Sequence, residues 1–252
     1  PFSEAPLLVF GDPSLLLRKE QRLIEGSGGR YRRPITTAIW PDDPAYAGSA
    51  RYTAGFLRVY DTLVLGFDGL LAWRCPPRRL VRLYDEHVSA RHLDIGVGTG
   101  YLLDKCRYPT ESPEITLMDL NPAPLQVAAE RLHRYRPKTH QANALEPFGL
   151  PAGTFESVGL NWLLHCLPGN IAAKCVVFDH ARTVLALGGV VFGSTVLSGG
   201  VRHTAWSRWM MGRLNRDGTF TNSDDDLDGL KTQLDQRFES AQVEVVGAVG
   251  IF

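Results

Sequence analysis

The sequence predicts an α/β fold in which a parallel sheet is covered by helices on both faces. Beyond residue 88, short apolar runs suited to buried strands alternate with stretches whose apolar residues recur at helical intervals. One of these runs leads into glycines at alternate positions, Gly96, Gly98 and Gly100, and then into a helical pattern. Because alternating strands and helices pack as parallel crossover units, these two features indicate an open sheet with helices on both sides.

Length and composition indicate one globular domain with a full core. The chain has 252 residues, 44% of them hydrophobic, and 27 Lys and Arg balance 27 Asp and Glu. A net charge of zero without a basic run gives no electrostatic footprint for nucleic acid or an anionic membrane, so we expect neither as a partner. No apolar stretch approaches the roughly 20 residues that cross a bilayer, and the N-terminus lacks the order of a secretory signal. We therefore expect a cytoplasmic protein.

The cysteines indicate neither a disulfide framework nor a metal centre. The chain has four of them, and no two form a Cys-x-x-Cys pair. Four cysteines are also too few for disulfide bonds to stabilise a chain of this length. We expect reduced thiols at Cys75, Cys106, Cys166 and Cys175, and no metal site.

The first 88 residues have a different pattern of prolines and apolar residues from the rest of the chain. Six of the sixteen prolines fall within residues 1–44, which predicts an extended arm with one helix near residues 13–25. From Tyr52 the apolar residues follow helical spacing until Cys75, Pro76 and Pro77 stop the pattern, and a further helix is expected to about His87.

The remaining residues carry the sheet. Amphipathic helices are expected around residues 125–132 and 177–185. Residues 242–252 have strand character, and we expect a break at Gly247. The strands themselves are expected at residues 92–95, 115–118, 157–160 and 190–193, with a weaker one near 139–142.

An acidic residue follows the second predicted strand. Asp119 lies 19 residues after Gly100, a spacing at which a carboxylate can bind both hydroxyls of a ribose held over a glycine loop. Asn121 and Pro122 then provide an N-cap and a first-turn proline, which keep Asp119 at the sheet edge. A tight turn without a ligand and a solvated aspartate are the alternatives, but the two features in register favour a nucleoside site.

The spacing of the glycines distinguishes between nucleosides. A dinucleotide loop of the form G-x-G-x-x-G would need glycine at position 101, where this chain has Tyr101. Asp94, two residues before the first glycine, would repel a pyrophosphate and suits a ligand with an ammonium group. S-adenosylmethionine meets both conditions, whereas NAD meets neither.

Four segments together resemble the motifs of the Rossmann-like, or class I, S-adenosylmethionine-dependent methyltransferases. They are residues 94–100, 117–122, 141–146 and 155–165, in the order and spacing of that family. The match extends over about residues 89–252, and residues 52–76 further resemble the helical cap of bacterial and fungal members that modify small molecules in secondary metabolism.

The resemblance implies the architecture in detail. It implies a doubly wound, mostly parallel, seven-stranded sheet with an antiparallel C-terminal strand and a helical N-terminal cap. Residues 1–88 are then the arm and cap, part of the same domain as the cofactor-binding core at residues 89–252.

The resemblance also implies the cofactor site. The methionine end of S-adenosylmethionine would lie near Asp94, the ribose on Asp119, and the transferred methyl beside Asn161. The family usually has an aspartate that accepts from the adenine amino group where this chain has Asn143, whose amide oxygen can accept the same hydrogen bond. A cap tyrosine touching the cofactor carboxylate would be Tyr60 or Tyr52, although both also fit plain cap packing. The remaining cofactor-binding residues would be Gly96, Gly98, Gly100, Leu120, which would pack on the adenine, and Ala144.

The catalytic and substrate residues are less defined by the sequence. His165 follows the fourth strand and is a candidate general base, or else a structural histidine that starts the next helix; His203 is a poorer candidate base. Residues 198–228 interrupt the sheet pattern and are expected to form a substrate lid, or a helix packed on the body. The expected pocket residues are Tyr52, Trp162, Trp206 and Met210, and the run Asp224, Asp225 and Asp226 is expected to be a solvated helix start.

The sequence therefore predicts methyl transfer from S-adenosylmethionine to a small molecule, most simply at oxygen, with nitrogen and carbon as alternatives, and S-adenosylhomocysteine as the product. A protein of this fold that binds the cofactor without transferring methyl, as a structural module or a cofactor-assisted cyclase, remains open. The glycine spacing disfavours a nicotinamide-dependent oxidoreductase.

Overall fold

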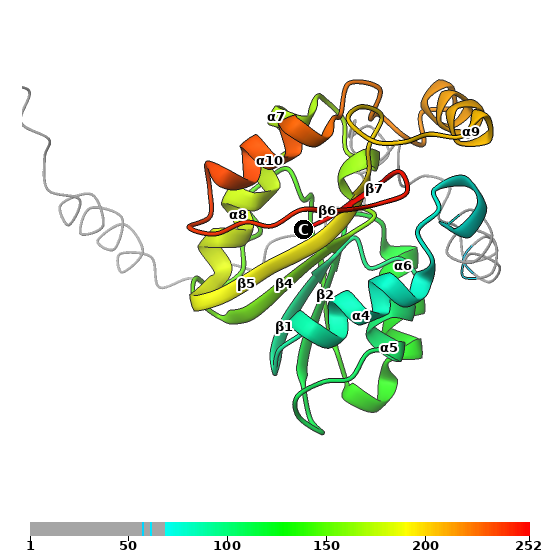
Figure 1. The fold of residues 1–252 in the computed structure, drawn as a ribbon. Coiled ribbons are helices and arrows are strands. Elements are labelled where there is room, and N and C mark those ends of the chain that lie inside the picture. The colour runs from blue at the N-terminus through cyan, green and yellow to red at the C-terminus, as the bar shows by residue number, and fades with distance from the viewer. Residues whose placement is uncertain (1–56, 58–60, 62–68) are drawn as a thin grey trace, which may run out of the picture. The chain divides into compact units, whose positions relative to one another are not determined.

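A seven-stranded sheet forms the centre of the chain, in the order β3-β2-β1-β4-β5-β7-β6 (Figure 1). β7 pairs antiparallel with both of its neighbours, and every other pairing in the sheet is parallel. The strands are β1 (Arg91–Ile95), β2 (Glu114–Asp119), β3 (Lys138–Gln141), β4 (Phe155–Asn161), β5 (Leu185–Val196), β6 (Glu244–Val246) and β7 (Val249–Ile251). The mostly parallel sheet with an antiparallel C-terminal strand is confirmed.

This computed structural model describes residues 57, 61 and 69–252. The chain divides into two compact units, residues 1–37 and 38–252, and all of the described residues belong to the second. The predicted arm, its helix near residues 13–25, and most of the cap lie outside the described residues. The same is true of Tyr52 and Tyr60, so the division of the chain at residue 88 stays a prediction.

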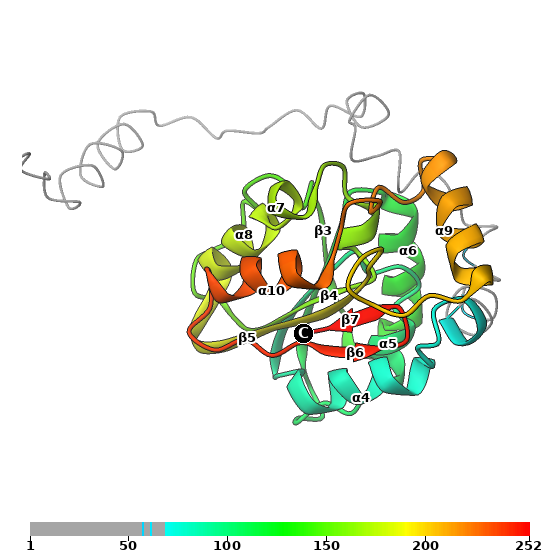
Figure 2. The same ribbon diagram turned by 45° about the horizontal axis from the view of Figure 1, so that its top comes forward.

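Helices cover both faces of the sheet (Figure 2). α4 (Pro77–His87), α5 (Tyr101–Lys105) and α6 (Pro122–Arg131) contribute to one cluster of buried apolar residues. α7 (Ile171–Lys174), α8 (Val176–Val184) and α10 (Leu227–Asp235) contribute to a second cluster. α9 (Ala205–Arg216) lies beyond the carboxyl edge of the strands. Two apolar clusters separated by a sheet are what a doubly wound fold requires, and the predicted fold class is confirmed.

Local sequence signals set the ends of several elements. The Asn121 side chain accepts from the backbone N–H of Ala123 at 2.9 Å, and Pro122 occupies the first turn, so α6 begins where the sequence predicts. Gly247 has a φ of +63° between β6 and β7, and a side chain there would collide with the carbonyl oxygen of Trp73. The expected break in the C-terminal strand material is therefore confirmed.

The acidic run before α10 differs from the prediction in one residue. Asp226 caps α10 through the N–H of Gly229, and Asp224 is exposed, as a solvated helix start requires. Asp225 is fully buried, and its Oδ2 accepts from Lys174 Nζ at 2.6 Å. Lys174 Nζ also donates to the carbonyl oxygen of Thr221 at 2.8 Å. The prediction of a solvated run is wrong for Asp225, because its cationic partner lies 51 residues away in the sequence.

All four cysteines are free thiols, as expected. Burial raises the pKa of Cys75 to about 11 and that of Cys106 and Cys175 to about 12, so these thiols remain protonated. Among the described residues, no helix is both long and apolar enough to span a membrane.

Candidate functional site

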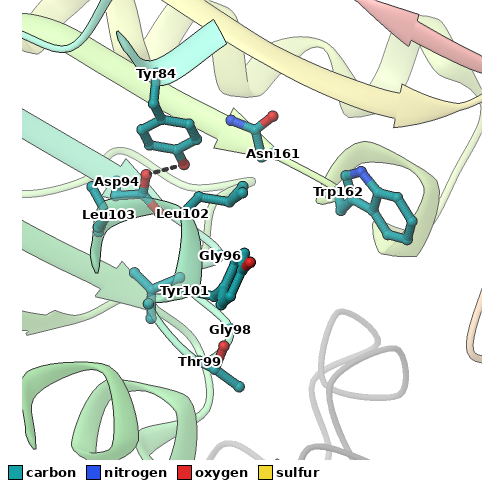
Figure 3. A pocket seen from close by; sticks show the side chains of 12 residues that line it. Tyr84, Asp94, Gly96, Gly98, Thr99, Tyr101, Leu102, Leu103, Asn161 and Trp162 are labelled. Carbon is teal, nitrogen blue, oxygen red and sulfur yellow. Dashed lines mark hydrogen bonds between the residues drawn. The ribbon is translucent and has the colours of Figure 1, made fainter. Parts of the chain in front are cut away.

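A pocket lies where β1 and β4 end at the carboxyl edge of the sheet (Figure 3). Open parallel sheets bind their ligands at this edge. Tyr84 and Asp94 lie together in the pocket, whereas Trp162 lies apart from them, farther along the chain that leaves β4. The lining residues are Tyr84, Asp94, Gly96, Val97, Gly98, Thr99, Gly100, Tyr101, Leu102, Leu103, Asn161 and Trp162.

The glycine loop adopts a backbone that side chains disfavour. Gly96, Gly98 and Gly100 have φ values of +73°, +52° and +71°. A Cβ at Gly96 would lie 2.9 Å from Leu163 Cδ1, and one at Gly100 would lie 3.1 Å from Ala128 Cβ. The N–H of Gly96 donates to the carbonyl oxygen of Met118 at 2.8 Å, which ties the loop to β2. The loop therefore packs closely against Leu163 and α6 with a backbone that only glycine adopts easily.

A hydrogen-bonded network fixes Asp94 on one side of the pocket. The Tyr84 hydroxyl donates to Asp94 Oδ2 at 2.5 Å, and His92 Nε2 lies 3.3 Å from the same oxygen. His92 Nδ1 meets Ser157 Oγ at 2.8 Å, and Ser157 Oγ accepts from the N–H of Ser89. Burial, with the adjacent Asp94, raises the pKa of Tyr84 well above its usual value, against a smaller opposing effect of the Asn161 amide. Tyr84 is therefore a neutral donor that orients the Asp94 carboxylate.

Asp119 ends β2, the strand beside β1. Its Oδ1 accepts from the N–H of Asn121 at 2.9 Å. Burial raises the pKa of Asp119 to about 7, although hydrogen bonds from the backbone N–H groups of Asn121, Leu120 and Val97 act in the opposite direction. Hydroxyl donors from a ligand would favour the ionised form and lower this pKa.

The residues expected around an adenine lie beside Asp119. Leu120 and Ala144 are buried apolar side chains, and Asn143 is 7% exposed. The N–H of Leu145 donates to Asn143 Oδ1 at 2.9 Å, so this oxygen shapes the turn after β3. A carbonyl oxygen has a second lone pair, so this turn is compatible with an additional donor.

The end of β4 presents two buried donors without partners. Asn161 is 8% exposed and Trp162 is 9% exposed. Ser194 Oγ donates to Asn161 Oδ1 at 2.8 Å, whereas Asn161 Nδ2 and Trp162 Nε1 have no partner at hydrogen-bond distance among the described residues. Trp162 also has a φ of +56°, a left-handed backbone that is uncommon for a bulky residue. Orphaned donors and strained backbone are features that cluster at ligand sites.

His165 lies in a 3₁₀ turn, residues Leu164–Cys166, and is 2% exposed. Its Nδ1 accepts from the N–H of Val196 at 3.2 Å, and its ring packs 4.3 Å from that of Phe220, centroid to centroid. Burial lowers the pKa of His165 to about 3, with a further contribution from Lys174, so the imidazole is neutral. These contacts favour the structural role over the general base.

The family to which the chain belongs follows from comparison with known proteins. Residues 93–191 match the model of a methyltransferase domain. The chain is 46% identical over 217 residues to demethylluteothin O-methyltransferase of Streptomyces thioluteus, over 86% of this chain and 94% of that protein. It is 37% identical over 211 residues to the physcion biosynthesis cluster O-methyltransferase of Aspergillus chevalieri, over 83% and 95%. The chain belongs to this family of methyltransferases.

The solved structure of DhpI with S-adenosylhomocysteine has the same fold. It aligns with this methyltransferase at a TM-score of 0.57 and 18% identity, over 82% of this chain and 94% of DhpI. The expected resemblance to the class I methyltransferases is thereby confirmed for both sequence and fold.

The structure of the methyltransferase brings only some of the expected substrate residues to the pocket. Trp162 lines it, whereas Trp206 and Met210 lie on α9 and do not. Trp206 is 49% exposed and stacks on Trp209, with ring centroids 4.8 Å apart. Met210 packs against the apolar cluster of α4, α5 and α6. His203 is held by Ser207 Oγ and the carbonyl oxygen of Ser198, at 3.2 and 3.1 Å.

Three residues that shape the site carry no clear signal in the sequence. Tyr84 is one of several apolar-face residues of α4, and nothing in its spacing marks it. His92 alternates with Asp94 in a predicted buried strand, and polar residues at such positions point to a network on one face of the sheet. Asp61 accepts from Thr99 Oγ1 of the glycine loop at 2.5 Å and from Arg131 Nη2 at the end of α6 at 2.6 Å. Only the folded chain brings Asp61 to this loop.

Proposed function

We propose that this methyltransferase transfers a methyl group from S-adenosylmethionine to a hydroxyl oxygen of a small molecule of secondary metabolism. The observation that carries the proposal is the glycine loop between two carboxylates, Asp94 at the end of β1 and Asp119 at the end of β2. Relatives at 46% and 37% identity are named O-methyltransferases, and DhpI binds S-adenosylhomocysteine.

The residues fit this cofactor in shape and charge. The loop brings glycine backbone to the pocket, where all three glycines have positive φ and a Cβ at Gly96 would clash with Leu163. Asp94 would accept from the cofactor's ammonium group, since Tyr84 and His92 both use Oδ2 and hold the carboxylate toward the pocket. Asp119 would accept from the ribose hydroxyls, with Leu120, Asn143 and Ala144 against the adenine.

When bound, the cofactor supplies an electrophilic methyl group on a positively charged sulfur. The contribution of the chain is to position the acceptor and to exclude water, which accounts for much of the acceleration available to a displacement of this kind. We assign no general-base role to His165, because its Nδ1 accepts from the N–H of Val196 and its pKa is about 3. Asn161 and Trp162 are the polar residues on the acceptor side.

The proposal is tested by incubating the protein with methyl-labelled S-adenosylmethionine and a panel of small phenols, enols, alcohols and amines. We expect labelled methyl ether and S-adenosylhomocysteine in equal amounts from at least one hydroxyl compound. Binding of S-adenosylhomocysteine without transfer to any acceptor would favour the cofactor-binding module or cyclase instead. Transfer only to amines would overturn the assignment to oxygen.

A further inference from the structure

A chain of hydrogen-bonding groups leads from the start of β1 to the pocket. Ser89 precedes β1 and is partly exposed, whereas Ser157, His92 and Asp94 are buried. Ser157 Oγ lies 2.7 Å from Ser89 Oγ and 2.8 Å from His92 Nδ1, and His92 Nε2 lies 3.3 Å from Asp94 Oδ2. A carboxylate of the pocket is therefore linked, through a buried imidazole, to two serine hydroxyls that do not line the pocket.

We propose that His92 is a positioning residue that orients Asp94 toward the ammonium group of the cofactor, and that Ser157 and Ser89 supply the donors that complete its Nε2–H tautomer. This inference rests on the proposed function and names residues, remote from the ligand, that determine how tightly its amino-acid end is bound.

The register of the sheet brings these side chains to one face. His92 and Asp94 alternate on β1, and their partners on β4 are Ser157 and Gly159. A Cβ at Gly159 would lie 2.9 Å from Asp94 Oδ2 and 3.2 Å from His92 Cε1. The contact between His92 and Asp94 therefore uses space that is available only because β4 has glycine at this position.

Aromatic rings hold the imidazole on two sides. Phe192 stacks on His92, with 5.7 Å between ring centroids and 24° between the planes. Tyr84 meets the imidazole edge-on at 6.0 Å between centroids. Packing therefore keeps Nδ1 toward Ser157 and Nε2 toward the carboxylate, and the hydrogen-bond partners determine which nitrogen carries the hydrogen.

These partners favour one tautomer. An ionised carboxylate only accepts, so His92 must present an N–H at Nε2, beside the hydroxyl that Tyr84 donates to the same oxygen. In a neutral imidazole Nδ1 then accepts, and Ser157 Oγ supplies the hydrogen. Ser157 Oγ in turn accepts from the backbone N–H of Ser89 at 3.0 Å and from its hydroxyl, whose other acceptor, the carbonyl oxygen of Arg91, is farther away at 3.2 Å. Every donor in this chain points toward the pocket.

The effect of His92 should be confined to the amino-acid end of the cofactor. Asp94 is the group assigned to the ammonium, whereas the ribose is assigned to Asp119. A carboxylate that loses a donor and its orientation would reduce the affinity for a ligand with an ammonium group, but not for one without it. A general loss of structure would weaken the binding of both ligands.

Calorimetric titration therefore compares S-adenosylhomocysteine with its analogue in which hydrogen replaces the amino group. His92→Phe keeps a ring against Phe192 but removes both nitrogens, and should weaken binding of S-adenosylhomocysteine by about tenfold or more. His92→Gln can place an amide N–H near the position of Nε2 and should stay within about threefold of the wild type. The affinity for the analogue should change less than about twofold in both variants.

Ser157→Ala tests whether Ser157 acts through His92. In the wild-type background this change should weaken binding of S-adenosylhomocysteine by about threefold or more, because Nδ1 loses its donor. In the His92→Phe background the same change should have an effect below about twofold, since no ring nitrogen remains for the hydroxyl to bond. Equal effects in the two backgrounds would overturn the assigned role of Ser157.

Nitrogen NMR of the ligand-free protein labelled with ¹⁵N-histidine reads the tautomer directly and does not depend on the folding of His92→Phe. The chain has seven histidines, and the signal of His92 is the one lost in His92→Gln. We expect hydrogen on Nε2 and none on Nδ1. Hydrogen on Nδ1, unchanged affinity for S-adenosylhomocysteine in His92→Phe, or equal losses for the two ligands would overturn the inference. Failure of the wild type to bind S-adenosylhomocysteine would instead contradict the proposed function, and the inference with it.

Discussion

The two sides of the glycine pocket differ in how their polar atoms are satisfied. On the β1 side, Asp94 is bound by Tyr84 and His92, and His92 continues to Ser157. On the β4 side, Asn161 Nδ2 and Trp162 Nε1 have no partner at hydrogen-bond distance in the part of the chain that the structure describes. A satisfied network holds its groups before any ligand arrives, whereas an orphaned donor is completed only by one. The difference teaches that the β1 side is held in place by its own contacts, whereas the β4 side keeps two donors open to a ligand.

The largest expected change in the free energy of unfolding comes from breaking the buried pair of Lys174 and Asp225. Lys174→Met would leave Asp225 buried without its cation, so the free energy of unfolding should fall by about 3–5 kcal/mol. The double variant Lys174→Met/Asp225→Leu should recover most of that loss. Urea denaturation measures both, and a loss below about 1 kcal/mol in the single variant would contradict the account of this pair.

Removing the Tyr84 hydroxyl tests the satisfied side of the pocket. Tyr84→Phe takes a donor from the buried Asp94 carboxylate, so the free energy of unfolding should fall by about 1.5–3 kcal/mol and binding of S-adenosylhomocysteine should weaken. Tyr108→Phe is the matched control, since the Tyr108 hydroxyl donates to the carbonyl oxygen of Leu103 and not to Asp94. Calorimetric titration should show unchanged affinity in Tyr108→Phe. Equal affinities in both variants would remove Tyr84 from the cofactor site.

We expect Asp119 to make cofactor binding depend on pH. Its pKa is about 7 in the free protein, and hydroxyl donors of a ribose would lower it, so binding releases a proton. The affinity for S-adenosylhomocysteine should therefore fall as the pH drops below about 7, and should approach a tenfold loss per pH unit. Asp119→Asn should bind about ten- to 100-fold more weakly near neutral pH, without this pH dependence. A wild-type affinity that is constant from about pH 5.5 to 8 would place the ribose elsewhere.

The smallest expected change in the free energy of unfolding comes from Trp162, on the β4 side of the pocket. Trp162→Phe removes a donor that has no hydrogen-bond partner among the described residues, so the free energy of unfolding should stay within about 0.5 kcal/mol of the wild type or rise. Urea denaturation measures this change. A loss of more than about 1 kcal/mol would mean that the indole N–H is satisfied in the free protein and that the two sides do not differ.

The sequence could predict the parts of this fold that are set by local signals. The glycine loop, the cap of α6 at Asn121 and the break at Gly247 each depend on residues within a few positions, and each lies where the pattern indicates. The alternation of strands and helices was sufficient to predict the parallel sheet, because crossover connections between parallel strands are almost always right-handed.

The parts that the sequence could not predict depend on contacts between distant segments. Lys174 and Asp225 are 51 residues apart, and Asp225 has the same sequence context as its exposed neighbours. Tyr84 reaches Asp94 from a helix face on which Leu80 and Leu83 are also buried. The burial of His165 depends on Phe220 and Val196, which also lie far along the chain. The pairing state of such groups is a property of tertiary packing.

The central claim is that the glycine loop between Asp94 and Asp119 binds S-adenosylmethionine and its product. Calorimetric titration with S-adenosylhomocysteine tests it most directly, in the wild type and in two glycine variants with similar backbone strain. Gly96 and Gly218 have φ values of +73° and +71°, but a Cβ at Gly218 would contact nothing within 4 Å. We predict one-to-one binding to the wild type and to Gly218→Val, no binding to Gly96→Val, and no binding of NAD to any of the three. Binding of S-adenosylhomocysteine to Gly96→Val with wild-type affinity, or binding of NAD in its place, would contradict the claim.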